Sequence, residues 1–173
     1  MDLASKIREI PDYPKPGILF YDMHSLMKEP GAIAEVIERF AEKFAPGGID
    51  AVAGIESRGF VFGAPLAVKL GCPFIPIRKP GKLPGETISI EYSLEYGTDK
   101  IQMQKDSLSA GMKTLIVDDL LATGGTMVAA CKLVETLGAK VAGIAFVVEL
   151  DFLKGREKLE GYETLSLVHY HSE

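Results

Sequence analysis

Two adjacent acids and a glycine pair lie close together in the segment VDDLLATGGT, residues 117–126. Asp118 and Asp119 end an apolar run, and Gly124 and Gly125 precede a stretch with helical periodicity. A glycine-rich turn before a helix binds phosphate through its backbone N–H groups and the positive end of the helix dipole. Carboxylates accept hydrogen bonds from hydroxyl groups. The segment therefore predicts a site for the ribose hydroxyls and the 5′-phosphate of a ribose 5-phosphate derivative.

The glycine turn differs from the two common nucleotide-binding turns. It lacks the lysine of GxxxxGK[ST] and the spacing of GxGxxG, and its acids precede the glycines. The simpler alternative is that the acids end a strand and the glycines make an ordinary turn. The acid pair disfavours that alternative. Burying two carboxylates costs free energy, and an ordinary turn binds no ligand that would offset this cost.

Basic side chains follow two other apolar runs. Arg58 comes after AVAGI, residues 51–55, within Glu56-Ser57-Arg58, and Arg78 and Lys79 end the run FIPIRK, residues 74–79. Ligands of parallel sheets bind beyond the carboxyl ends of the strands. We therefore expect these cations and the acid pair to meet in one cleft.

The elements that must position these residues alternate along the chain. Helical periodicity covers 31–44, 59–71 and 126–138, and strand-like apolar runs cover 51–55, 74–79, 114–119 and 141–150. This order predicts an α/β fold with a central parallel sheet flanked by helices. Residues 80–104 alternate polar and apolar side chains, which favours a hairpin-like lid over the cleft.

Composition narrows the class of protein. The 173 residues, 47% of them hydrophobic, fit a single domain with one sizeable core. A net charge of -5 argues against a general nucleic-acid or anionic-membrane binder. Cys72 and Cys131 form no CxxC pair and are expected to be free thiols in a reducing compartment. No signal-peptide pattern or run of about 18 apolar residues is seen, so we expect a cytoplasmic location.

Several further motifs, in order, accompany the ribose-phosphate segment. They are IPDYPKPGILFYD (10–22), AGIESRGFVFG (53–63), IRKPGKLPGET (77–87), YSLEYG (92–97), QKD (104–106) and LKGREKL (153–159). With VDDLLATGGTM (117–127), nearly the whole chain resembles the type I phosphoribosyltransferases, and in particular the branch that uses adenine.

The resemblance implies both a fold and an activity. The fold would be a single domain, 1–173, with a small N-terminal base-binding hood at about 1–30 and a flexible lid at about 80–104. The enzyme would act in purine salvage and transfer phosphoribosyl from 5-phospho-α-D-ribose 1-diphosphate to adenine, giving AMP and diphosphate. Mg²⁺ would be carried mainly by the substrate, and two copies would form a homodimer.

The resemblance also assigns roles to residues. The 5′-phosphate would be bound by Ala122, Thr123, Gly124, Gly125 and Thr126, and the diphosphate by Arg58, Arg78, Lys79 and Lys82. Adenine would stack on Phe20 and meet the backbone of Leu19, and the catalytic residues would be Glu95, Asp118 and Asp119. A cis peptide is expected between Glu56 and Ser57. Tyr21 departs from the arginine that many members carry, which puts a side-chain contact to the purine from this position in doubt.

Two other functions fit part of the pattern. A phosphoribosyltransferase for an oxopurine would share the phosphate turn and differ at residues 18–22 and at Glu95. A non-catalytic sensor of phosphoribosyl diphosphate would need a DNA-binding module, for which the chain offers neither length nor a basic helix. His169 and His171 would share a strand face, but without a third ligand in view they predict no metal site.

Overall fold

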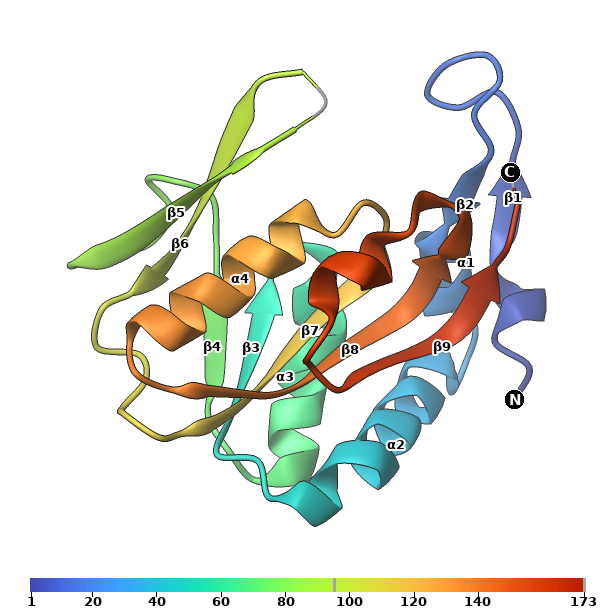
Figure 1. The fold of residues 1–173 in the computed structure, drawn as a ribbon. Helices are drawn as coiled ribbons and strands as arrows, with labels where there is room; N and C mark the ends of the chain where they lie inside the picture. The colour runs from blue at the N-terminus through green and yellow to red at the C-terminus, as the bar shows by residue number, and fades with distance from the viewer. Residues whose placement is uncertain (95, 173) are drawn as a thin grey trace.

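A five-stranded parallel sheet forms the centre of the computed structural model, which describes residues 1–94 and 96–172 (Figure 1). Its strand order is β4-β3-β7-β8-β9. The bounds are β3 Ala51–Ile55, β4 Phe74–Ile77, β7 Lys113–Leu121, β8 Lys140–Leu150 and β9 Thr164–Tyr170. Every pairing within it is parallel. The predicted α/β fold is therefore confirmed.

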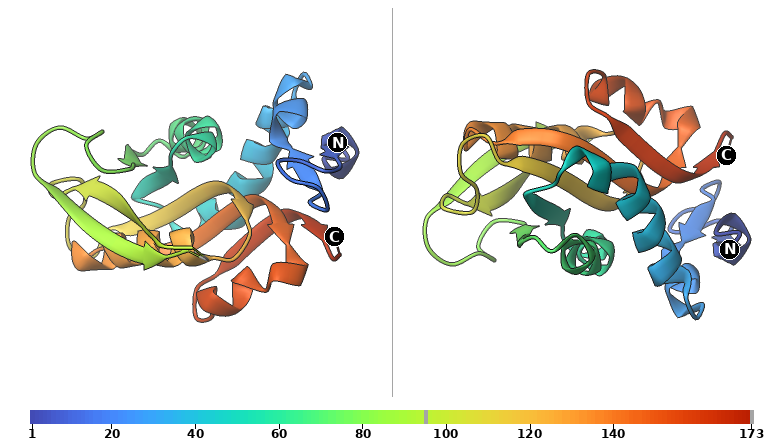
Figure 2. Two further views of the ribbon diagram at one scale, coloured as in Figure 1. Left: turned by 90° about the horizontal axis from the view of Figure 1, so that it is seen from above. Right: turned by 90° about the horizontal axis from the view of Figure 1, so that it is seen from below.

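Helices cover both faces of this sheet. Helices α2 (Ala32–Phe44) and α3 (Arg58–Leu70) lie on one face, and α4 (Gly125–Thr136) lies on the other (Figure 2). Each begins and ends within two residues of its predicted bounds. The buried residues of α2 include Val36, Ile37, Phe40 and Phe44, which are spaced three and four apart as an amphipathic helix requires. Short helical segments are α1 (Met23–Lys28), η1 (Ala4–Lys6), η2 (Ala45–Gly47), η3 (Asp151–Leu153) and η4 (Gly155–Leu159).

The N-terminal region forms a small separate layer beside β9. Strands β1 (Arg8–Ile10) and β2 (Phe20–Asp22) pair antiparallel, and we call residues 1–30 the hood. The Asp22 side chain accepts a hydrogen bond from the backbone N–H of His24 and so caps α1. The buried ring of Tyr21 stacks on Tyr170 of β9 at a centroid distance of 3.8 Å. This stack joins the hood to the edge of the sheet.

The alternating stretch between β4 and β7 forms a β-hairpin. Strand β5 (Thr87–Ser93) pairs antiparallel with β6 (Thr98–Gln104), as the sequence pattern predicts. The apolar side chains of the hairpin pack in the same core cluster as the buried residues of α4. They are Ile88, Ile90, Ile101 and Met103. The hairpin and the hood both rise on the side of the sheet to which the strands' carboxyl ends point (Figure 1).

The structure also bears on the expected free thiols and on the absence of a membrane-spanning run. Cys72 and Cys131 are both free thiols, and burial raises the pKa of Cys131 to about 12. Within the described part of the chain, no helix combines the length and apolar character that crossing a membrane requires.

Candidate active site

The acid pair lies inside β7 near its carboxyl end. The predicted strand end at residue 119 is two residues short, because Leu120 and Leu121 continue to pair with β8. The carboxylate of Asp118 accepts a hydrogen bond of 2.9 Å from the backbone N–H of Asp119. Asp119 is 5% exposed and Asp118 is partly buried. Both acids are thus held by the sheet itself.

The two carboxyl groups differ in their electrostatic surroundings. Burial, and then the negative charge of Asp119, raise the pKa of Asp118 well above its ordinary value. Asp119 instead accepts a hydrogen bond of 2.5 Å from the guanidinium Nε of Arg58, at the first position of α3. One acid of the pair is therefore neutralised by a cation, and the other binds its proton more tightly.

The predicted phosphate turn directly follows β7. Residues 122–126 line a cavity of about 90 Å³ together with Asp118, Leu120, Leu121, Met127 and Phe146. Gly124 has a φ of +87°, a left-handed conformation that favours glycine, and α4 begins at Gly125. The start of α4 thus borders a small cavity at the end of the strand, the geometry expected for binding a phosphate group.

A second cavity of about 310 Å³ adjoins the turn and contains the acid pair. Its lining includes Arg58, Lys79 and Glu56, and also Tyr92 and Ile101 from the hairpin. Asp118, Leu120 and Thr126 line both cavities. The structure therefore brings together the phosphate turn, the acid pair and two of the four predicted diphosphate-binding cations.

All four of these cations are paired with acids. Arg58 pairs with Asp119, and Lys79 pairs with Asp99 of the hairpin. The Nη2 atom of Arg78 and the Nζ atom of Lys82 lie 3.2 and 3.1 Å from the same oxygen of Glu56. Burial opposes ionisation of Glu56, but hydrogen bonds from the Lys79 backbone, Lys82 and Arg78 outweigh it and lower its pKa. A diphosphate would have to compete with carboxylates for these cations.

Sequence reasoning placed the Glu56-Ser57-Arg58 turn at the cleft without giving Glu56 a role, and it missed Tyr92 and Asp99. Tyr92 and Asp99 face each other across the hairpin, and both bind Lys79 Nζ. A hydrogen bond to Lys79 lowers the pKa of Asp99, so the pair is charged at neutral pH. The pairing follows from the hairpin register, and Gly97 between two alternating runs was the available sequence signal for it.

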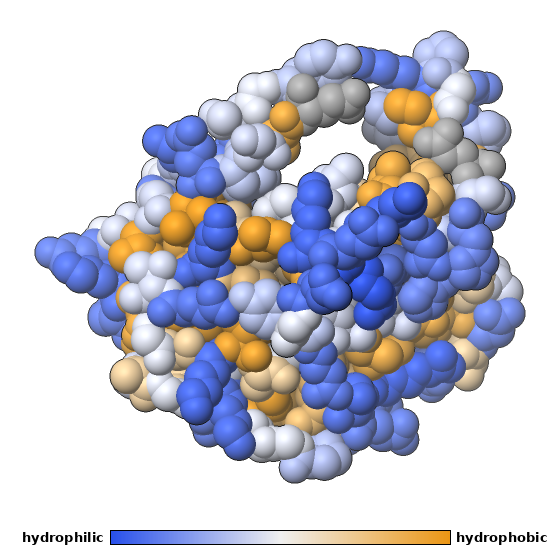
Figure 3. All heavy atoms as spheres, in the orientation of Figure 1, coloured by the Kyte–Doolittle hydropathy of each residue, from blue (hydrophilic) through white to orange (hydrophobic). Residues whose placement is uncertain are grey.

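The predicted base-binding residues lie on the hood. Leu19 and Phe20 are partly buried, and the Phe20 ring packs edge-on against Tyr13 at 5.0 Å. Tyr21 points to the opposite face of β2, where it is buried against Tyr170. Figure 3 shows the surface hollowed between the raised hairpin and the hood. Glu95 lies outside the described residues.

The expected cis peptide is confirmed between Glu56 and Ser57. It lies between β3 and α3, at the turn that presents Glu56 and Arg58 to the larger cavity.

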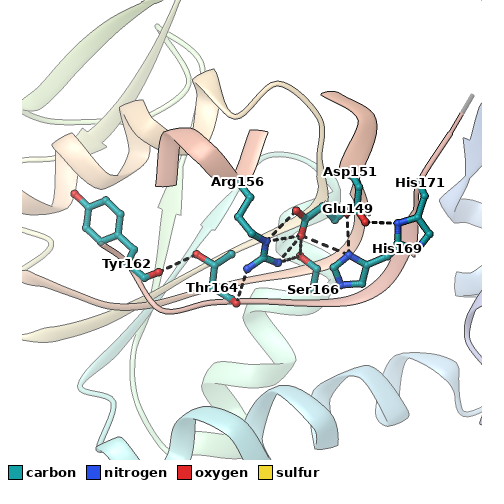
Figure 4. A network of polar contacts seen from close by, with 8 residues as sticks. All are labelled: Glu149, Asp151, Arg156, Tyr162, Thr164, Ser166, His169 and His171. Atoms are coloured by element: carbon teal, nitrogen blue, oxygen red, sulfur yellow. Dashed lines mark hydrogen bonds and ion pairs between the residues drawn. The ribbon is translucent and has the colours of Figure 1, made fainter. Parts of the chain in front are cut away.

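The two C-terminal histidines lie in a separate polar network (Figure 4). The Nδ1 atoms of His169 and His171 lie 2.9 and 2.6 Å from the two carboxylate oxygens of Asp151. Glu149, Asp151 and His169 offer oxygen and nitrogen atoms within 4.8 Å of one another. Arg156 already binds Glu149, however, and its positive charge opposes a metal ion there.

Comparison with known proteins gives a consistent result. A model of the phosphoribosyl transferase domain matches residues 23–166. The parallel sheet, the phosphate turn and the acid pair thus belong to a phosphoribosyltransferase domain.

More similar proteins define the family within this class. An adenine phosphoribosyltransferase of Koribacter versatilis (strain Ellin345) is 56% identical over 97% of this chain and 92% of its own length. The crystal structure of adenine phosphoribosyltransferase from Thermoanaerobacter pseudethanolicus is 52% identical, with a TM-score of 0.91 over 98% of both chains. The Saccharomyces cerevisiae enzyme, complexed with adenine and an imino-altritol bisphosphate, is 44% identical, with a TM-score of 0.90 over 96% of both chains. The chain belongs to the adenine phosphoribosyltransferase family.

Proposed function

We propose that this protein transfers the phosphoribosyl group of 5-phospho-α-D-ribose 1-diphosphate to N9 of adenine, in purine salvage. The C1′–O bond to diphosphate breaks, the C1′–N9 bond forms, and the N9 proton leaves the purine. One observation carries the proposal: Asp118 and Thr126 line both the cavity at the phosphate turn and the cavity that holds the cations. A single ribose bridging the cavities would meet the turn with its 5′-phosphate and the cations with its diphosphate.

The charges in the cleft suit this reaction. Loss of diphosphate builds positive charge on the ribose and negative charge on the leaving group. Asp118 and Asp119 would stabilise the ribose and accept hydrogen bonds from its hydroxyls. Arg58, Arg78, Lys79 and Lys82 would stabilise the diphosphate by exchanging their carboxylate partners for phosphate oxygens. The hairpin, whose Tyr92 lines the larger cavity, would limit the entry of water, the competing nucleophile.

Magnesium fits the donor set of the cleft. Glu56, Asp118 and Asp119 line the larger cavity, and Mg²⁺ prefers oxygen ligands such as their carboxylates. Arg58, Arg78 and Lys82 already bind two of these carboxylates, and Asp118 is the one of the three without such a side-chain partner, so the ion would arrive mainly with the substrate phosphates. Bound Mg²⁺ would neutralise charge on the diphosphate.

Adenine would bind at the hood, with Phe20 as the stacking ring and the Leu19 backbone at its edge. The position of Phe20, partly exposed on β2 opposite the buried face of Tyr21, supports this assignment. So does the yeast relative, whose structure holds adenine together with a bisphosphate. The named relatives favour adenine over both the oxopurine alternative and a non-catalytic sensor.

Glu95 would accept the purine proton. Its motif YSLEYG, residues 92–97, lies in the hairpin region whose Tyr92 lines the larger cavity. Glu95→Gln should lower kcat by roughly 100-fold, a typical contribution of general acid–base catalysis, and leave the Kd for phosphoribosyl diphosphate unchanged. A kcat equal to that of the wild type across the pH range would remove Glu95 from the mechanism.

A second copy of the chain would be the protein partner, and the cytoplasm the compartment. Helix α3 carries an apolar stripe on its outer side, formed by Val61, Ala64, Pro65 and Val68. Val68 is 82% exposed and continues this stripe, and contiguous exposed apolar surface is typical of a protein–protein contact. The two free thiols fit a reducing compartment.

Product analysis tests the proposed reaction. The purified protein, incubated with adenine, phosphoribosyl diphosphate and Mg²⁺, should form AMP and diphosphate in equal amounts. The double variant Asp118→Asn/Asp119→Asn is the matched control and should form far less AMP. Phosphoribosyl diphosphate binding without any product from adenine, hypoxanthine or guanine would contradict an enzymatic function.

A further inference from the structure

The chain between β8 and β9 returns to the back of the phosphate turn. Gly155 begins η4, which packs against α4. A Cβ atom at Gly155 would lie 2.3 Å from the carbonyl oxygen of Ala122 and 3.1 Å from the carbonyl carbon of Thr123. A Cβ atom at Gly124 would lie 2.8 Å from the carbonyl oxygen of Gly155. The two backbones therefore touch without side chains between them, so the position of Gly155 limits the position of the turn.

The next residue, Arg156, fastens this segment to the sheet. Its Nε atom donates hydrogen bonds of 2.9 and 3.1 Å to the two carboxylate oxygens of Glu149, and its Nη2 atom also binds Glu149. The same guanidinium donates to the carbonyl oxygen of Thr164 at 2.9 Å and to the Ser166 hydroxyl at 3.1 Å. Figure 4 shows Arg156 reaching from its own segment across to β8 and β9. Such planar, multiply bonded geometry fixes orientation as well as distance.

Glu149, which accepts these bonds, is itself fixed in position close to the phosphate turn. Glu149 is 3% exposed and lies in β8 directly opposite Leu121, the residue before the phosphate turn. The Ser166 hydroxyl donates a hydrogen bond of 2.6 Å to it from β9. Burial opposes ionisation of Glu149, but hydrogen bonds from Arg156 and Ser166 outweigh it and lower the pKa, so the carboxylate is charged at neutral pH.

We propose that Gly155 and the Glu149–Arg156 ion pair are positioning residues for the phosphate turn. The ion pair holds the 151–159 segment on the sheet, and the backbone of Gly155 supports the turn from behind. The N–H groups of the turn are thereby kept in the orientation that receives a 5′-phosphate. None of the three residues lines either cavity. The inference rests on the proposed function, because it assumes that the turn binds the 5′-phosphate.

Separate binding measurements on the two ends of the substrate test this inference. Isothermal titration calorimetry gives the Kd of ribose 5-phosphate, which reports on the turn, and of inorganic diphosphate with Mg²⁺, which reports on the cations. Gly155→Ala and Arg156→Lys should each raise the Kd of ribose 5-phosphate about 10-fold or more, as expected when hydrogen bonds to a charged group lose their geometry. The Kd of diphosphate should change less than about 2-fold, the spread expected for an untouched site.

Matched controls are available elsewhere in the chain. Gly47→Ala adds a Cβ where no heavy atom lies within 4 Å, and Arg39→Lys alters an ion pair on the outside of α2. Neither should change either Kd. If Gly155→Ala does not fold, Arg156→Lys with a circular dichroism spectrum like the wild type still decides the matter.

Three outcomes would overturn the inference. One is an unchanged Kd for ribose 5-phosphate in a folded Arg156→Lys variant. Another is an equal weakening of both ligands, which would indicate general loosening rather than support of the turn. The third is a wild-type protein that does not bind ribose 5-phosphate at all, and this result alone would also contradict the proposed function.

Discussion

At the scale of single residues, the acid pair lowers the stability of the fold and has a proposed role in the reaction at the ribose. The folded state raises the pKa of Asp118 by burial and by the charge of Asp119, so it binds the proton more tightly than the unfolded chain does. Stability therefore falls as the pH rises from the ordinary carboxyl pKa to the raised value, and it stays lower above that window. At pH values above the ordinary carboxyl pKa, Asp118 therefore lowers the stability of the fold.

Replacing the two acids separately should give opposite effects on stability. Asp118→Asn should raise Tm at pH 7 by a few degrees, and the gain should shrink towards pH 4.5. Asp119→Asn should lower Tm, because it removes the partner of Arg58. Both variants should lose kcat/KM, on the order of 10- to 1,000-fold, by analogy with other single electrostatic contributions. Thermal unfolding at both pH values and steady-state kinetics measure these effects.

The opposite result for Asp118 would be informative. If Asp118→Asn lowered Tm in parallel with activity, the acid would have a structural role in β7. The proposed role near the ribose would then lose its support.

The sequence predicted those site residues whose partners are adjacent in the chain. The phosphate turn at 122–126 and the acids before it form one continuous segment, and the structure brings them together with Arg58 and Lys79. Asp99, and the role of Glu56 as an ion-pair partner, were not predicted, because they depend on which distant cations face these acids. Tyr21 also needed the structure, since only the hood's docking on β9 shows that its ring stacks on Tyr170.

At the scale of elements, the hairpin both lines the cleft, through Tyr92 and Ile101, and holds one of its cations. Lys79 comes from the loop after β4, whereas its partners Asp99 and Tyr92 come from β6 and β5. Binding of diphosphate to Lys79 would break the pair with Asp99, and hairpin position and ligand binding would then be coupled.

Removing the competing carboxylate should therefore favour the ligand. Asp99→Asn should lower the Kd of inorganic diphosphate by about 2- to 10-fold, because it takes away a partly exposed ion-pair partner worth roughly 1 kcal/mol. Glu91→Gln removes an exposed hairpin acid that pairs with Lys100 instead, and it should leave this Kd unchanged. Calorimetry with Mg²⁺ and diphosphate measures both. Weaker binding by Asp99→Asn would show that Asp99 orients Lys79 for the ligand rather than competing with it.

Elements with a long periodic pattern were predicted well, and short ones were not. The long helices have apolar residues at a helical spacing over ten or more residues, which no strand would satisfy. The parallel strands are apolar runs bounded by turn residues. Strands β1 and β2 have three residues each, so their pairing depends on the packing of the hood rather than on a local pattern. Segments η3 and η4 likewise depend on Arg156, whose partners lie in β8 and β9.

At the scale of the whole molecule, the α3 stripe is the surface that we expect a second copy to cover. Val68→Glu should shift the protein from dimer to monomer in sedimentation velocity, because it places a charge within an apolar contact. Lys132→Glu, an exposed position on α4 across the sheet, is the matched control and should leave the oligomer intact. A dimer that persists in Val68→Glu would place the interface elsewhere.

The choice of purine is the most direct test of the proposed function. Adenine presents an N6 amino donor and an N1 acceptor, whereas hypoxanthine presents an O6 acceptor and an N1 donor. A backbone carbonyl and N–H beside Phe20 would satisfy adenine and would face like groups in hypoxanthine. The decisive measurement is the ratio of kcat/KM for the two bases at saturating phosphoribosyl diphosphate and Mg²⁺. The account predicts a preference for adenine approaching roughly 10,000-fold, the discrimination of a site built on hydrogen bonds, and comparable values for the two bases would contradict it.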